Sequence, residues 1–241
     1  MRITLAQSTE AFYSLVAWRI AQAIIEKPDA VVGLATGRTT TGVHAALAAI
    51  YAAHPFDTSR VTVFGMDEIT NVSRTFPGSC YDMLLRQVVR PLNIPLDHFL
   101  MPPTFSDDFH AECRAFSEAI ASRGGVDLQI MGIGENGHLG FNQPGTPFES
   151  TTWISRMDET LDARIRRECG AAPEDDLRGF TIGVKDIMMS RRVILAANGR
   201  NKAAIVKKAL YGPVTPEVPA SVLQLHPFCE AILDPDAADI K

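Results

Sequence analysis

The sequence has no excess of basic residues. Its 23 lysines and arginines are outnumbered by 28 aspartates and glutamates, which gives a formal net charge of −5. Proteins that bind nucleic acid usually carry a basic patch or stripe, so we expect no nucleic-acid partner. A small anionic ligand would need lysines and arginines that are gathered locally in its pocket.

Long apolar segments are also lacking. No apolar run approaches the roughly 18 residues of a membrane span. The first residues, MRITLAQSTEAF, contain no long apolar stretch of the kind found in signal peptides. We therefore expect no membrane association and a cytoplasmic location.

Cysteine is scarce and its spacing is uninformative. Two cysteines separated by two residues, or a cysteine spaced from histidines as in zinc sites, would indicate a metal. The chain has neither pattern in its four cysteines, which are Cys80, Cys113, Cys169 and Cys229. They are typical of reduced, mainly structural thiols in a cytosolic protein, and we expect no metal site.

What the sequence does contain is an alternation of short apolar runs and longer helix-like segments. The expected strands cover residues 3–6, 30–34, 61–64, 128–131, 193–197 and 231–233. The expected helices cover residues 9–26, after a cap at Ser8 or Thr9, and residues 39–53, 77–89, 107–123 and 202–210. This alternation predicts an α/β fold with a doubly wound, mostly parallel sheet and helices on both faces, a Rossmann-like three-layer sandwich. The length suits a single domain over residues 1–241.

A glycine-rich loop follows the expected strand at residues 128–131. It places His138 just past the carboxyl end of that strand, which is where open α/β sheets bind ligands. Glycine neighbours put no side chain between the imidazole and a ligand. A histidine in an ordinary turn is the alternative.

Two other stretches fall at expected strand ends. Thr36, Gly37, Arg38 and Thr39 lie between a strand and a helix, whose N-terminus would direct free N–H groups and a positive dipole at a phosphate. A plain capped turn is the alternative. Asp67 leads out of the strand at residues 61–64 and is placed to accept a proton, although adjacent acids more often form a helix cap or a solvated pair. Convergence of the three stretches would suit an enzyme that isomerises a sugar phosphate.

Four ordered segments resemble the glucosamine-6-phosphate deaminase/isomerase family. They are Met66-Asp67-Glu68, the threonine–glycine loop at residues 36–39, the segment Gly-Glu-Asn-Gly-His-Leu-Gly-Phe-Asn-Gln-Pro at residues 134–144, and Val-Pro-Ala-Ser-Val-Leu-Gln-Leu-His at residues 218–226. Residues 27–30, 124–128 and 185–187 are somewhat nearer to the galactosamine-6-phosphate branch. Related sugar lactonases share the fold and a Gly-His loop, but not Phe141-Asn142 followed by Pro144.

The resemblance implies that a 2-amino-2-deoxyhexose 6-phosphate, with a galacto or gluco C4 epimer, is converted to a ketohexose 6-phosphate and ammonia. By position, Asp67 is the C2 base and His138 the acid/base that opens the ring. Lys202 matches the family's phosphate lysine, and Arg166 its phosphate arginine, with Arg164 and Arg167 as rivals or as a solvated basic helix face. This chemistry requires no metal and no organic cofactor. The expected partner is a small sugar phosphate.

The resemblance leaves the oligomeric state open, and a homo-oligomer is compatible with it. The chain ends at Lys241, soon after the last expected strand. We therefore expect that it lacks the extra C-terminal segment of longer, allosterically regulated relatives.

Two positions depart from the family pattern. The family's histidine is oriented by flanking carboxylates, whereas this chain has Asn136, which also occurs in the family, and Gln143, which does not. An amide accepts a hydrogen bond from imidazole but supplies no charge to stabilise imidazolium. Arg38 stands where many relatives carry a small residue, and it either adds a phosphate donor or crowds the loop. The other readings are an isomerase or lactonase acting on a different sugar phosphate, and a catalytically weakened sugar-phosphate-binding protein.

Overall fold

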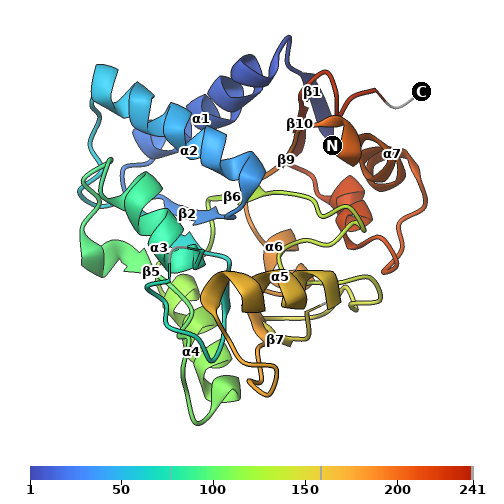
Figure 1. Ribbon diagram of the computed structural model, residues 1–241. Coiled ribbons are helices and arrows are strands. Elements are labelled where there is room, and N and C mark those ends of the chain that lie inside the picture. The colour runs from blue at the N-terminus through green and yellow to red at the C-terminus, as the bar shows by residue number, and fades with distance from the viewer. Residues whose placement is uncertain (77, 158, 240–241) are drawn as a thin grey trace.

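A seven-stranded sheet forms the centre of the molecule in the computed structural model, which describes residues 1–76, 78–157 and 159–239 (Figure 1). All of its neighbouring strands pair in parallel, in the order β1-β10-β9-β6-β2-β3-β5. The strands are β1 (Arg2–Leu5), β2 (Val31–Leu34), β3 (Thr62–Gly65), β5 (Phe99–Leu100), β6 (Leu128–Met131), β9 (Val193–Ala197) and β10 (Cys229–Leu233). The predicted parallel α/β fold is confirmed.

Helices cover both faces of this sheet and make it the middle of three layers. One face packs against α1 (Thr9–Glu26), α2 (Arg38–Ala53), α3 (Cys80–Leu84) and the π-helical turn η1 (Leu85–Val89). The other packs against α4 (Phe109–Ala121), α6 (Val184–Met188), α7 (Ala203–Tyr211) and the 3-10 helix η4 (Pro219–Leu225). Successive strand residues supply the two cores in turn, since Ile130 belongs to the first core and Met131 to the second.

The strand order contains a switch point next to β2. After β2 the chain adds β3 and β5 on one side, and it then returns to place β6 on the other side of β2. In open α/β sheets the crevice outside the carboxyl ends of the strands at such a point is the ligand site. The loops after β2, β3, β6 and β9 therefore lie at the edge of the sheet where such a crevice is expected.

A second sheet of three short antiparallel strands, in the order β4-β8-β7, was not predicted from the sequence. It comprises β4 (Asp67–Ile69), β7 (Trp153–Ser155) and β8 (Gly179–Thr181). With α5 (Glu159–Cys169), this sheet packs on a small core of its own, in which Ile69, Phe141 and Ile165 take part. Asp67 is consequently the first residue of β4, one residue after the end of β3.

The predicted element boundaries are close to those observed, and two predicted helices change type along their length. The helix expected at residues 77–89 begins at Cys80 and turns π-helical from Leu85, and Pro77 lies outside the described residues. The helix expected at residues 202–210 starts as a 3-10 turn, η3 (Arg200–Lys202), and a further 3-10 turn, η2 (Leu96–His98), precedes β5. Among the described residues no helix is long and apolar enough to span a membrane.

Candidate active site

Asp67 lies at the junction of the two sheets. Only Met66 separates it from the end of β3, and its backbone pairs opposite Thr181 in β8. The carboxyl group is partly buried, and Oδ1 accepts a 3.5 Å hydrogen bond from the Cys80 thiol. Burial raises the pKa of Asp67 to about 7, the Cys80 bond opposes this rise, and the Glu68 carboxylate adds to it. A carboxyl group with this pKa can accept and return a proton near neutral pH.

Glu68, the next residue, has a structural role. Its buried carboxyl group accepts backbone N–H bonds from Ile69, Cys80 and Tyr81 at 3.0, 3.1 and 2.7 Å. It thereby fixes the first turn of α3 against β4. The capping interpretation of the acidic pair therefore holds for Glu68, while Asp67 faces the crevice.

The loop after β6, which carries His138, passes beside Asp67. The imidazole packs directly over Gly134, where a Cβ atom would lie 2.2 Å from the ring, so only glycine fits there. Two residues after the histidine, Gly140 has a φ of 58°, and a Cβ atom there would lie 3.1 Å from Asp67 Oδ2. The His138 loop therefore passes against the candidate base, as the sequence predicted.

Asn136 and Gln143 brace this loop. The Asn136 amide donates to Gln143 Oε1 at 2.9 Å, and its carbonyl accepts from the His138 backbone N–H at 3.1 Å. Gln143 Nε2 is buried and has no hydrogen-bond partner among the residues that the structure describes. The two neutral amides therefore contact each other, Asn136 also contacts the His138 backbone, and their role towards the imidazole stays a prediction.

The loop after β2 has the geometry predicted for a phosphate site. Gly37 caps the 16-residue helix α2 without a side-chain hydrogen bond, so the helix N-terminus is open to a ligand. The Thr36 hydroxyl donates to Cys80 Sγ at 3.0 Å, and the Thr39 hydroxyl donates to Asn198 Oδ1 at 2.6 Å. The second bond ties the start of α2 to the segment after β9.

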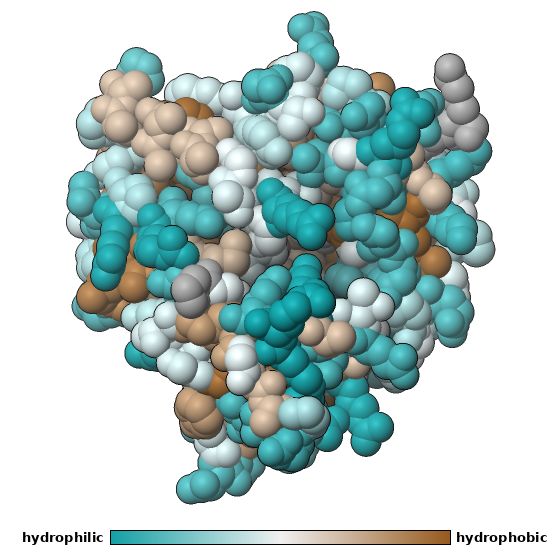
Figure 2. Space-filling view, viewed as in Figure 1, coloured by the Kyte–Doolittle hydropathy of each residue, from teal (hydrophilic) through white to brown (hydrophobic). Residues whose placement is uncertain are grey.

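Two cations gather at this helix end. Burial lowers the pKa of Lys202, Glu135 opposes the shift, and Arg38 adds to it, so the two cations are close enough to repel each other. Like charges held together in an acidic protein are stabilised by an anion. Figure 2 shows strongly hydrophilic side chains in the middle of the face viewed in Figure 1, between the end of α2 and α5.

The arginines of α5 are held differently from one another. Arg166 bonds to Asp162 at 2.6 Å, to the Asp175 carbonyl at 2.8 Å and to the Ala172 carbonyl, all within its own segment. Arg164 makes an ion pair of 3.8 Å with Glu168, and its side chain is 47% exposed. The bonds of Arg166 weigh against its predicted phosphate role, which stays a prediction.

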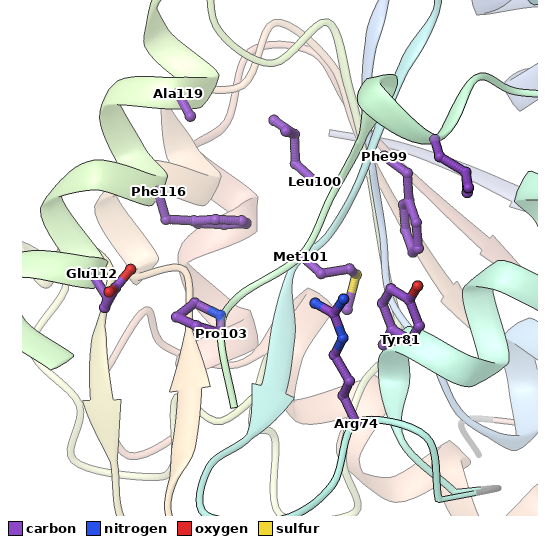
Figure 3. A pocket seen from close by; sticks show the side chains of 10 residues that line it. Arg74, Tyr81, Phe99, Leu100, Met101, Pro103, Glu112, Phe116 and Ala119 are labelled. Atoms are coloured by element: carbon purple, nitrogen blue, oxygen red, sulfur yellow. The ribbon is translucent and has the colours of Figure 1, made fainter. Parts of the chain in front are cut away.

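A separate cavity of about 500 Å³ lies at the β5 edge of the large sheet (Figure 3). Arg74 stacks over the Tyr81 ring at 4.4 Å from its centroid, and Phe99 stacks on Tyr81 as well. Leu100, Met101, Phe116 and Glu112 add further lining. None of the predicted site residues lines this cavity, so it is distinct from the crevice at the switch point.

Cys80 and Asn198 contact predicted site residues but were missed as members of the site. Asn198 directly follows the expected strand at residues 193–197, so the strand-end rule could have identified it. Cys80 gave no signal, because it lies inside an expected helix and its contacts come from distant parts of the chain. The residues that the structure describes contain no group of three or more His, Cys, Asp or Glu side chains that could hold a metal ion.

Known proteins resemble this chain over most of its length. A family model described as glucosamine-6-phosphate isomerases/6-phosphogluconolactonase matches residues 4–230. Glucosamine-6-phosphate deaminase of Clostridium botulinum is 36% identical over 238 residues, 99% of this chain and 98% of that protein. The same enzyme of Lachnoclostridium phytofermentans is 40% identical over 211 residues, 86% of this chain and 88% of that protein.

Solved structures extend the comparison. A monomeric glucosamine-6-phosphate deaminase superposes with a TM-score of 0.93 at 32% identity, over 100% of both chains. The 6-phosphogluconolactonase of Trypanosoma brucei has a TM-score of 0.75 at 19% identity, over 99% of this chain and 97% of that one. The second likeness shows a shared fold.

Proposed function

The chain belongs to the glucosamine-6-phosphate isomerase/6-phosphogluconolactonase family, and from this premise we propose that it deaminates and isomerises a 2-amino-2-deoxyhexose 6-phosphate. The observation that carries the proposal is the carboxyl group of Asp67, whose pKa is about 7, beside the His138 loop. The anion site at α2 lies at the same edge of the sheet. A base, an imidazole and a phosphate site in one crevice are what this reaction needs.

The proposed reaction starts with the closed sugar. His138 moves the proton that opens the ring and leaves an aldehyde at C1. Asp67 removes the proton from C2 while the C1 oxygen is protonated, which gives an enolamine. Asp67 then returns its proton to C1, and C2 becomes an iminium. Water adds to C2 and ammonia leaves, so one water is consumed and a ketose 6-phosphate is released.

The substrate phosphate is assigned to the loop of Thr36, Gly37, Arg38 and Thr39 together with Lys202. The N-terminus of α2 supplies N–H groups and the positive end of its dipole. Cations at Arg38 and Lys202 supply charge, and the raised local potential favours a dianion. Arg38 therefore acts as a donor in this proposal.

Ammonia release is the direct test of the proposed function. Glucosamine- and galactosamine-6-phosphate should be assayed side by side, because the relatives are named glucosamine-6-phosphate deaminase while residues 27–30, 124–128 and 185–187 resemble the galactosamine branch. Release from either substrate supports the proposal. Hydrolysis of a phosphogluconolactone without ammonia release would indicate the lactonase alternative, and tight binding without turnover would indicate a sugar-phosphate-binding protein.

We expect Gln143→Glu to raise kcat on closed-ring substrate several-fold. The glutamate supplies a negative charge beside the His138 loop and favours imidazolium, and it can still accept from Asn136 as Gln143 Oε1 does. The measurement is steady-state ammonia release. Gln143→Met, of similar length but without an acceptor, should give no such gain. An unchanged or lower kcat in Gln143→Glu would mean that Glu135 or Glu149 already serves the histidine, or that Gln143 is adapted to another substrate.

The arginine on α5 can be identified by comparing two variants. We expect Arg164→Ala to raise KM for the sugar 6-phosphate about 10- to 100-fold, the cost of one hydrogen bond to a charged group. Arg166→Ala should instead lower thermal stability with less change in KM, because Arg166 bonds to Asp162 and two carbonyls in its own segment. The reverse pattern would restore Arg166 as the phosphate arginine.

The solved relative is described as monomeric. A homo-oligomer of this chain stays a prediction.

A further inference from the structure

Cys80 bridges the two parts of the proposed active site. It is the first residue of α3, and only 7% of it is exposed. Its sulfur accepts the Thr36 hydroxyl at 3.0 Å, and its S–H donates to Asp67 Oδ1 at 3.5 Å. One thiol therefore touches both the phosphate loop and the candidate base.

The thiol is itself held in place. The backbone N–H of Cys80 donates to the buried Glu68 carboxylate at 3.1 Å, and the Ser79 hydroxyl caps α3 by accepting from the Asp82 N–H at 3.0 Å. The start of α3 is thus fixed to β4, and the Cys80 side chain has a defined direction. The contacts of α3 with β4 therefore also position the two groups that the thiol bonds, Thr36 and Asp67.

We propose that Cys80 is a positioning residue that sets the distance and orientation between Asp67 and the phosphate loop, an inference that rests on the proposed function. The base acts at C2 of the sugar, whereas the phosphate is on C6. Both contacts must be satisfied at once for proton transfer, so a fixed relation between the two sites favours the reactive pose.

The direction of the two hydrogen bonds follows from the protonation of the thiol. Burial raises the pKa of Cys80 well above its ordinary value, and the charges of Glu68 and Asp67 add to this. The group is therefore a neutral S–H that donates to the Asp67 carboxylate and accepts from Thr36. It fixes Oδ1 of Asp67 and leaves Oδ2 facing Gly140, on the side of the His138 loop.

Removing the thiol has a predictable effect on Asp67. The Cys80 bond lowers the pKa of Asp67, against the larger effect of burial. In Cys80→Ala this pKa should therefore rise, by about half a unit to one unit for a single lost hydrogen bond. The acid limb of the pH–rate profile should move to higher pH by the same amount.

The test uses Cys80→Ala, Cys80→Ser and the control Cys113→Ala. Cys113 is a free thiol in α4 with 5% exposure, and the hydrophobic core in which it lies contains none of the predicted site residues. We expect Cys80→Ala to lower kcat on the order of 10-fold with a smaller rise in KM. Serine keeps a donor and an acceptor, so Cys80→Ser should restore both kcat and the pH profile. Cys113→Ala should leave them unchanged.

A second readout separates this inference from the proposed function. Aspartate labelled with ¹³C at the carboxyl carbon allows the pKa of Asp67 to be followed by NMR, with its signal assigned by loss in Asp67→Asn. If no aminosugar phosphate releases ammonia, the proposed function fails while this titration still tests the Cys80–Asp67 bond. An unchanged Asp67 pKa in Cys80→Ala would overturn the inference, and so would a serine variant as impaired as the alanine variant.

Discussion

Replacing Asp67 with asparagine should lower kcat for ammonia release by about 10²-fold or more. The amide keeps the shape of the side chain but cannot take a proton from C2. The binding of substrate should change little, because the phosphate is held elsewhere. Near-normal ammonia release by this variant would end the assignment of Asp67 as the base.

The same substitution should make the folded protein more stable, and the gain should depend on pH. The pKa of Asp67 is raised from 3.8 to about 7 in the folded state. Well below pH 3.8 the carboxyl group is protonated whether the chain is folded or unfolded, so it does not oppose folding. As pH rises towards 7 the unfolded chain releases this proton while the folded chain retains it, and wild type loses stability. Above pH 7 the loss is complete, and Asp67→Asn should be more stable by on the order of 2–4 kcal/mol.

Urea unfolding at about pH 4 and pH 8 measures this difference. Asp82→Asn is a suitable control, since Asp82 in α3 forms an ion pair with the half-exposed Arg86 in the following turn η1, and pairs open to solvent contribute little. Its kcat and stability should both stay close to wild type. Loss of activity together with loss of stability in Asp67→Asn would instead point to a structural role for the carboxylate.

Lys202→Ala should raise KM for sugar 6-phosphates about 10- to 100-fold with little change in kcat. A hydrogen bond to a charged group contributes roughly 1.5–3 kcal/mol, and Lys202 and Arg38 are the two cations of the proposed site at the N-terminal end of α2. In the alanine variant the phosphate can still bind the N-terminus of α2, but Arg38 is the only one of the two cations that remains. Initial-rate measurements over a wide substrate range give the two constants separately.

Wild type should also bind non-phosphorylated aminosugars poorly, because they lack the group that this site holds. Lys207→Ala, which removes an exposed lysine of α7, serves as the matched control and should keep a normal KM. Equal affinity of wild type for galactosamine with and without its phosphate would contradict the phosphate assignment.

Most of the large sheet could be predicted, because β2, β3, β6, β9 and β10 are buried, largely apolar runs bounded by turn residues. The two-residue strand β5 was not predicted. The small sheet could not be predicted, because β4, β7 and β8 have three residues each, which is too short for a periodic pattern. Their pairing depends on contacts such as Asp67 with Thr181, which are distant in sequence. Short strands of this kind are stabilised by the tertiary fold rather than by local sequence.

Candidate site residues that follow the end of a strand could be picked out from the sequence. Candidate residues within a helix could not, because the sequence does not show which side chain of the helix faces the site. Asp67, His138 and the Thr36 loop all follow strands, and parallel strands deliver their carboxyl ends to one edge. Arg164 and Arg166 belong to the same helix, and only their packing shows that Arg166 is engaged within its own segment. Cys80 is defined by two contacts across the fold that no local pattern records.

The pairing of β4 with β8 has a consequence for the identity of the base. Successive strand residues point to opposite faces, and a slip of one residue exchanges those faces. Here such a slip would bring Glu68 into the crevice and turn Asp67 towards the amides of α3. The register of β4 against β8 therefore decides which of the two adjacent carboxylates is the candidate base, and the alignment of Asp67 with Thr181 selects Asp67. An insertion or deletion of a single residue between β3 and β4 would abolish this selection without changing either acid.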